Sequence, residues 1–274
     1  MSAGFGERVR TALSSSGPLC VGIDPHAALL DAWGLTQDAA GVREFGLRTV
    51  DAAAGLVAIV KPQVSFFERF GSAGFGALED VLAAARAAGL IVIADAKRGD
   101  IGSTMDAYAA AWLTPGSPLE ADALTVSPYL GVGALDGAFA LAEQHGKGVF
   151  VLAATSNPEA EPLQRSRGGE RSVAAGVLAE VSARNEAAVA PGEWGSIGVV
   201  IGATVDWRAA GIEAFAPSAP ILAPGFGAQG AEPADLGDRF GAMAASVIAS
   251  ESRSILGAGP DGIRAAIEAR VAQY

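Results

Sequence analysis

The chain has 274 residues and a formal net charge of −11, and half of its residues are hydrophobic. This length fits one large barrel or two small domains with a sizeable core, and an acidic chain without a basic stripe argues against a nucleic-acid partner. Cys20 is the only cysteine, no apolar run reaches the roughly 18 residues of a membrane span, and the first residues lack a signal-peptide pattern. We therefore expect a cytoplasmic protein with no membrane association, no internal disulfide and no thiolate metal cluster.

Eight short apolar runs recur along the chain, and most are continuous in Val, Ile, Leu and Ala, as in parallel strands covered on both faces. In chain order they are 19–24, 55–63, 89–97, 121–128, 148–155, 196–203, 220–225 and 244–253. The segments between them have helical spacing, most clearly 76–88, 174–188 and 259–273. This alternation predicts an α/β fold, a (β/α)8 barrel that forms one catalytic domain over residues 1–274.

The alternative fold is an open, doubly wound sheet. Such sheets usually carry Gly-x-Gly-x-x-Gly after the first strand, whereas the first strand here leads into Asp24-Pro25-His26. No shift in composition marks a second domain. The barrel is therefore the favoured prediction.

The longest polar insertion, at about 156–172, follows the fifth strand and contains Arg165, Arg167 and Arg171. It has two interpretations: a mobile lid over an anion, or a solvated surface loop.

The run 95–104 reads Asp-Ala-Lys-Arg-Gly-Asp-Ile-Gly-Ser-Thr and begins where an apolar strand ends. Side chains two apart on a strand share a face, so Asp95 and Lys97 are expected to point the same way as Ile91 and Ile93. A charged pair at the tip of a buried face is costly unless it is paired. The run is therefore a candidate functional site.

Polar residues stand at the other predicted strand ends as well, and in a barrel these ends meet at one rim. They are Asp24, Lys61, Asp95 with Lys97, Ser127, the loop 224–229 and Arg253. The glycines of the 224–229 loop and Arg253, at the start of a helix, together suggest a phosphate site.

Simpler roles are open for several of these residues. Asp24 could be the N-cap of the next helix, with Pro25 in its first position. Asp100 and Thr104 would share a helix face if that helix begins near Asp100, or they could cap it. Ser127 could be a turn residue. The two histidines, His26 and His145, have no metal-ligand neighbours and are expected to be structural or surface residues.

The motif Asp95-x-Lys97-x-x-Asp100-Ile101-x-x-Thr104 resembles the orotidine 5′-phosphate decarboxylase family. Asp24, Lys61, Ser127, Pro224, Gln229 and Arg253 follow the expected order, and the resemblance covers nearly the whole chain. The length and the Ala-Thr-Ser-Asn-Pro stretch at 154–158 are similar to the longer bacterial branch of the family. The 156–172 insertion departs from the compact members.

The resemblance implies that Lys97 is the cation beside C6 of the pyrimidine and its proton donor. Asp95 would lie next to the substrate carboxylate, and Lys61 would link the charges and contact the ribose. Asp100 and Thr104 would reach into the partner's site of a homodimer, where Ile101 would line the base pocket.

The remaining implied roles concern substrate binding. Asp24 would bind a ribose hydroxyl, and Ser127 would read the pyrimidine edge. Gln229 and Arg253 would hold the phosphate, and the segment around Pro224 would cover the ligand. The implied reaction converts orotidine 5′-phosphate to uridine 5′-phosphate, the last step of UMP synthesis, with no cofactor and no metal.

The implied chemistry explains the residue types. Loss of CO2 from C6 leaves a carbanion in the plane of the ring, so its stabilisation must be electrostatic, and a fixed ammonium supplies it and then the proton. Burial alone would lower the pKa of a lysine, whereas carboxylates on either side of Lys97, Asp95 and Asp100, would keep it charged.

Two rival functions are open. Magnesium-dependent sugar-phosphate enzymes, such as ketogulonate-phosphate decarboxylase and hexulose-phosphate synthase, resemble the chain at its third strand. Their metal needs a carboxylate at the end of strand two, where this chain has Lys61-Pro62-Gln63. The second rival is a non-catalytic nucleotide-phosphate binder on the same fold.

Overall fold

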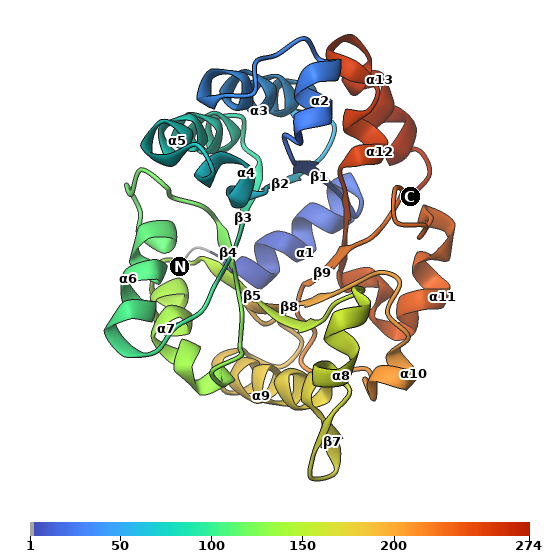
Figure 1. The fold of residues 1–274 in the computed structure, drawn as a ribbon. Helices are drawn as coiled ribbons and strands as arrows, with labels where there is room; N and C mark the ends of the chain where they lie inside the picture. The colour runs from blue at the N-terminus through green and yellow to red at the C-terminus, as the bar shows by residue number, and fades with distance from the viewer. Residues whose placement is uncertain (1–2) are drawn as a thin grey trace.

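A closed barrel of eight parallel strands forms the centre of the computed structural model, which describes residues 3–274 (Figure 1). The strands are β1 (Leu19–Ile23), β2 (Ile59–Pro62), β3 (Ile91–Arg98), β4 (Ala123–Val126), β5 (Gly148–Ala154), β8 (Ile197–Ile201), β9 (Ile221–Pro224) and β10 (Val247–Glu251). Each lies within or overlaps a predicted run, and β1 pairs with β10 to close the ring. The predicted (β/α)8 barrel is confirmed, and the open sheet is excluded because the barrel has no free edge.

The strands are mostly apolar because both of their faces are covered, and the charged residues of β2, β3 and β10 stand toward their C-terminal ends. Inside the barrel, each strand contributes one side chain to a common cluster: Cys20, Ile59, Ile93, Ala123, Phe150, Val200, Leu222 and Ile248. The alternate side chains point outward and join a larger cluster between the strands and the helices. This two-sided burial accounts for the continuous apolar runs in the sequence.

Helices surround the barrel (Figure 1). The longer ones are α3 (Ala39–Ala53), α5 (Gly71–Ala87), α6 (Gly102–Leu113), α7 (Asp136–Gln144), α9 (Val173–Ala188) and α13 (Gly259–Val271). The shorter ones are α2 (Ala27–Ala32), α4 (Val64–Glu68), α8 (Glu161–Gln164), α10 (Trp207–Ala210), α11 (Leu236–Phe240) and α12 (Arg253–Leu256). The three helices expected from spacing appear as α5, α9 and α13, displaced by a few residues at their ends.

The helix α1 (Phe5–Ser16), which was not among the helices expected from spacing, lies across the end of the barrel where the strands begin (Figure 1). Phe5 and Val9 are fully buried in the interior cluster. The Phe5 ring packs edge-on against Phe150, with 5.9 Å between centroids. It occupies the space that a Cβ at Gly148 would need. The N-terminal end of the barrel is therefore plugged.

The insertion 156–172 has structure of its own. It contains α8 and a two-stranded antiparallel pair, β6 (Arg167–Gly168) and β7 (Arg171–Ser172). The Gln164 side chain accepts a hydrogen bond from the backbone N–H of Thr155 at 2.9 Å and donates one to its hydroxyl at 3.0 Å. These two bonds fasten the insertion to the end of β5.

Across residues 3–274, the structure contains no helix with the length and apolar character that crossing a membrane requires.

Candidate active site

A cavity of about 490 Å³ opens at the C-terminal ends of the barrel strands. Seven of the residues predicted from sequence line it: Asp24, Lys61, Asp95, Lys97, Pro224, Gln229 and Arg253. They come from β1, β2, β3, β9 and β10 or from the segments that follow these strands. The barrel therefore brings together side chains that are up to 229 positions apart in the sequence, because parallel strands end at the same rim.

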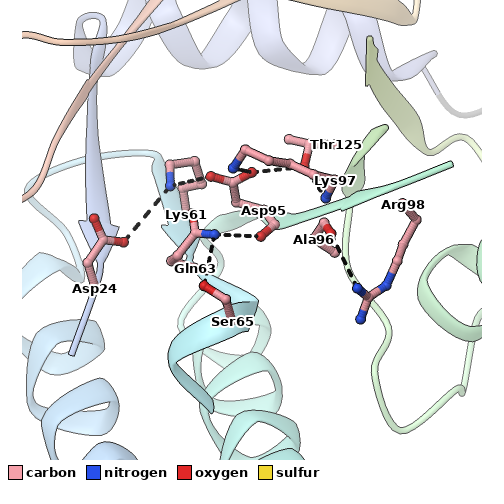
Figure 2. Close-up of polar contacts among 9 residues, drawn as sticks. All are labelled: Asp24, Lys61, Gln63, Ser65, Asp95, Ala96, Lys97, Arg98 and Thr125. Carbon is pink, nitrogen blue, oxygen red and sulfur yellow. Dashed lines mark hydrogen bonds and ion pairs between the residues drawn. The ribbon is translucent and has the colours of Figure 1, made fainter. Parts of the chain in front are cut away.

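Charges of alternating sign run along one wall of the cavity (Figure 2). The Lys61 ammonium donates to Asp95 Oδ2 at 3.0 Å and lies 4.0 Å from Asp24 Oδ1. The Lys97 ammonium donates to Asp95 Oδ1 at 2.6 Å. We call this series, Asp24–Lys61–Asp95–Lys97, the charge ladder.

The ladder is buried in its middle and accessible at Lys97. Lys61 is 5% exposed and Asp95 is 7% exposed, whereas 47% of the Lys97 side chain is exposed. Lys97 therefore presents its side chain to the cavity, and Asp95 and Lys61 are more deeply buried.

Electrostatics inside the ladder keeps both buried members charged. Burial tends to raise the pKa of Asp95, but the ammonium groups of Lys61 and Lys97 outweigh it and hold this pKa well below its usual range. Burial tends to lower the pKa of Lys61, but Asp95 and then Asp24 outweigh it and raise this pKa above its ordinary value.

Asp24 does not cap a helix. The N-cap of α2 is His26, and no side chain accepts the cap hydrogen bond there. Asp24 instead faces the cavity and Lys61, so the capping interpretation was wrong. Its Oδ1 atom and the hydroxyl of Ser252 are buried and have no hydrogen-bond partner among residues 3–274. Both residues line the cavity.

Four of the predicted site residues do not line the cavity. Ser127 follows the last residue of β4, and its backbone N–H donates to the Arg98 carbonyl at 2.8 Å. Asp100 precedes α6, which begins at Gly102, so the expected shared helix face with Thr104 does not form. Ile101 is 61% exposed and Thr104 is also exposed. Asp100, Ile101 and Thr104 therefore lie outside this chain's own cavity.

Other lining residues escaped the sequence analysis. His26, which was given no role, packs against the Phe66 ring with 4.3 Å between centroids, and both line the cavity. Thr155, at the end of β5, lines it as well. Thr125 lies behind the ladder, where its hydroxyl is 2.9 Å from Asp95 Oδ1. Position 125 is two residues after the interior Ala123, so alternation along β4 was the available signal for Thr125.

The donor set at the end of β2 is unsuited to a hard cation. A magnesium site needs a carboxylate there, and the structure has the Lys61 ammonium bonded to Asp95. Within residues 3–274, no group of three or more His, Cys, Asp or Glu side chains is arranged to hold a metal ion.

Comparisons with known proteins agree with this geometry. The family described as orotidine 5′-phosphate decarboxylase / HUMPS matches residues 17–269. A Streptomyces coelicolor protein named orotidine 5′-phosphate decarboxylase is 53% identical over 261 residues, which cover 94% of this chain and 91% of that protein. A Corynebacterium glutamicum protein of the same name is 52% identical over 258 residues, or 94% and 92% of the two chains.

Solved structures of proteins named as orotidine 5′-phosphate (OMP) decarboxylases are also similar to the chain. The crystal structure of a Streptomyces avermitilis protein aligns with a TM-score of 0.92 at 50% identity, covering 100% of this chain and 95% of that one. The structure of Leishmania donovani OMP decarboxylase aligns with a TM-score of 0.77 at 31% identity, covering 97% and 95%. The chain therefore belongs to the orotidine 5′-phosphate decarboxylase / HUMPS family.

Proposed function

We propose that the protein is a carboxy-lyase that converts orotidine 5′-phosphate to uridine 5′-phosphate and CO2 without a cofactor, as the last step of UMP synthesis. The observation that carries this proposal is the charge ladder, which ends in a half-exposed ammonium inside the cavity. The two bacterial relatives described above, which bear this enzyme's name, are 53% and 52% identical to the chain, each over 94% of its length. Both lines of support point to the same reaction.

The ladder suits an electrostatic mechanism. When the bond from C6 to the carboxylate breaks, its electron pair stays on C6 and CO2 departs. The Lys97 ammonium stabilises that pair and then donates a proton to C6, after which the neutral amine regains a proton from water. Asp95 holds the ammonium by its 2.6 Å hydrogen bond, so the positive charge is in place before the bond breaks.

The rest of the cavity suits a nucleotide. Its volume of about 490 Å³ lies within the usual range for small-ligand sites. We assign the unpartnered Asp24 Oδ1 to a ribose hydroxyl, which can donate to it, and the Ser252 hydroxyl to a ribose or phosphate oxygen of the substrate. Arg253 and Gln229 lie on the segments that follow β10 and β9, the common phosphate position of such barrels.

The residues outside the cavity support a homodimer. Asp100, Ile101 and Thr104 are placed at the outer surface beyond β3. Large apolar side chains are exposed on the segments that follow β3 and β4, namely Ile101, Tyr108, Tyr129 and Leu130. We propose that this surface packs on a second copy of the single-domain chain, so that Asp100, Ile101 and Thr104 complete the partner's site.

Lys97→Ala tests the function. We expect wild-type protein mixed with orotidine 5′-phosphate in a chelator to show the absorbance change of pyrimidine decarboxylation, and Lys97→Ala to lose nearly all turnover. The control is Lys147→Ala, which removes another ion-paired lysine, bound to Glu120 at 2.8 Å and distant in the chain from every ladder residue. Lys97→Ala activity within about tenfold of wild type, or about 1.4 kcal/mol, would contradict the assigned role.

The same assay separates the rival functions. A metal-dependent sugar-phosphate enzyme would leave orotidine 5′-phosphate unchanged and would lose its own activity in the chelator. A non-catalytic binder would hold uridine 5′-phosphate tightly without turning over the substrate. The lysine at the end of β2 and the complete charge ladder favour the decarboxylase over both.

A further inference from the structure

Lys97 has an unusual backbone. It is the one non-glycine residue between positions 3 and 274 with a positive φ, at +49°. This left-handed conformation costs a residue with a Cβ about 1–2 kcal/mol. The pairing of β3 with β4 also shifts register between Ala94 and Arg98. The strand is therefore irregular at the residue that carries the proposed catalytic ammonium, and surrounding contacts must hold it there.

The side chain of Thr125 provides such a contact. The backbone N–H of Lys97 donates to the Thr125 hydroxyl at 3.0 Å, in a position where a regular strand would use a carbonyl of its neighbour. Because an N–H group can only donate, the hydroxyl accepts this bond, and its own proton points to Asp95 Oδ1 at 2.9 Å. The same carboxylate oxygen accepts the Lys97 ammonium at 2.6 Å.

These bonds form a closed circuit, shown in Figure 2. It runs from the Lys97 backbone through the Thr125 hydroxyl to Asp95, and back to Lys97 through its ammonium. The Thr125 hydroxyl thus contacts both the backbone of Lys97 and the carboxylate that pairs with its ammonium.

Thr125 is itself firmly held. It is 1% exposed and lies within β4, in register with Phe150 of β5 and two residues beyond Ala123. Both of those neighbours belong to the interior cluster. A β-branched side chain in a packed strand has few rotamers, so the hydroxyl has a defined direction.

We propose that Thr125 is a positioning residue for decarboxylation: its hydroxyl holds Lys97 in the left-handed conformation and orients Asp95, so that the ammonium points at the reacting carbon. This inference rests on the proposed function. It assigns Thr125 no contact with the substrate.

Thr125→Val tests it, because valine keeps the shape and removes the hydroxyl. We expect kcat with orotidine 5′-phosphate to fall by at least about tenfold, or about 1.4 kcal/mol in activation free energy. The Kd for uridine 5′-phosphate should change by less than about twofold, because the phosphate and ribose groups are untouched. Thr125→Ser, which restores the hydroxyl, should recover kcat to within about threefold of wild type.

Thr49→Val is the matched control. Thr49 is also fully buried and donates to the Phe45 carbonyl at 2.8 Å, but it lies in the helix layer on α3. We expect it to lower thermal stability and to leave kcat unchanged. If Thr125→Val does not fold, Thr125→Ala is measured in the same way.

Each outcome is decisive. An unchanged kcat in Thr125→Val, or a serine variant no better than the valine variant, overturns the positioning role. So does a loss of kcat in Thr49→Val as large as that in Thr125→Val, because the effect would then be one of general stability. Wild-type protein that does not decarboxylate orotidine 5′-phosphate would instead refute the proposed function.

Discussion

Asp95 is the residue on which the other site residues depend. Its two carboxylate oxygens accept from the Lys61 ammonium, the Lys97 ammonium and the Thr125 hydroxyl. A buried carboxylate is costly unless its lone pairs are used and its charge is matched. Here both conditions are met, so Asp95 stays ionised next to the position where the substrate's own carboxylate is proposed to bind.

The shifted pKa values of Asp95 and Lys61 predict a pH dependence. The pKa of Asp95 is depressed on folding, so its contribution to stability is complete above its unfolded pKa of about 3.9 and is lost as pH falls through the lower folded pKa. The pKa of Lys61 is raised on folding, so its contribution is complete below about 10.4 and is lost as pH rises through the higher folded pKa.

We therefore expect Asp95→Asn to be less stable than wild type by a constant amount between about pH 5 and 9, and by a shrinking amount below about pH 4. Urea unfolding across this range measures the difference. Asp80→Asn removes an exposed partner of Arg43 and should differ little from wild type at any pH. A difference for Asp95→Asn that grows below pH 4 would contradict the assigned charges.

At the scale of elements, β10 joins the side of the cavity proposed to bind the phosphate to the last helix. Glu251, the final residue of β10, is fully buried and accepts from the Arg270 guanidinium at 2.6 and 3.0 Å. The Tyr274 and Ser254 hydroxyls donate to it, each at 2.7 Å. Burial and then Glu251 raise the pKa of Tyr274 above its ordinary value. One carboxylate thus ties α13 to the first turn of α12.

Glu251→Ala would leave Arg270 with its buried partner missing. Breaking a buried pair in this way typically costs 3–5 kcal/mol, so we expect the free energy of unfolding to fall by about 3 kcal/mol. Urea denaturation measures it. Glu268→Ala removes an exposed ion pair from the same helix and should have little effect. Equal effects of the two substitutions would show that Glu251 does not anchor α13.

The same carboxylate also explains a glycine in the loop 225–231. Gly227 has φ of +68°, and a Cβ there would lie 2.5 Å from the Ser254 hydroxyl and 2.7 Å from Glu251 Oε2. The loop that carries Gln229 therefore sits directly on the start of α12, which carries Arg253. This close approach brings both proposed phosphate ligands to one corner of the cavity.

Arg253→Ala tests that corner. The guanidinium is proposed to bind the phosphate through charge-assisted hydrogen bonds, so we expect the affinity for uridine 5′-phosphate to fall by at least about tenfold, or 1.4 kcal/mol. Binding of uridine, which lacks the phosphate, should be unchanged. Calorimetric titration of both ligands measures the contrast. Equal losses for nucleotide and nucleoside would place Arg253 elsewhere in the site.

At the scale of the whole molecule, the proposed dimer makes a prediction about mixed subunits. Lys97→Ala removes a group from the chain's own site, whereas Asp100→Ala is expected to damage the partner's site. A heterodimer of the two variants would have one intact site and one doubly defective site. After subunit exchange in an equal mixture, about a quarter of all sites should be intact.

The measurement is turnover before and after exchange. The control mixture combines Lys97→Ala with Asp95→Asn, and both defects lie in the variant chain's own site. Its turnover should not increase after exchange. Failure of the first mixture to exceed the mean activity of its components would argue against shared sites.

The amino-acid sequence by itself determined the barrel and most of the site. Strands covered on both faces must be continuously apolar, and polar residues such as Lys61 and Arg253 at their ends are therefore conspicuous. The alternation of side chains along a strand predicted that Asp95 and Lys97 point the same way. Because parallel strands end at one rim, the order of these residues along the chain was enough to predict a common cavity.

The tertiary structure decided the features that depend on where a strand ends or on packing between segments distant in the sequence. Residues 125 and 127 would share a face if β4 continued, but β4 ends at Val126, so Thr125 reaches Asp95 whereas Ser127 does not line the cavity. The irregular backbone at Lys97 is stabilised by β4, which is remote in sequence. The helix α1 is explained by the open end of the barrel that Phe5 fills. Local pattern cannot encode the end of β4, the backbone of Lys97 or the position of α1, because each is set by contacts between segments that only the closed barrel brings together.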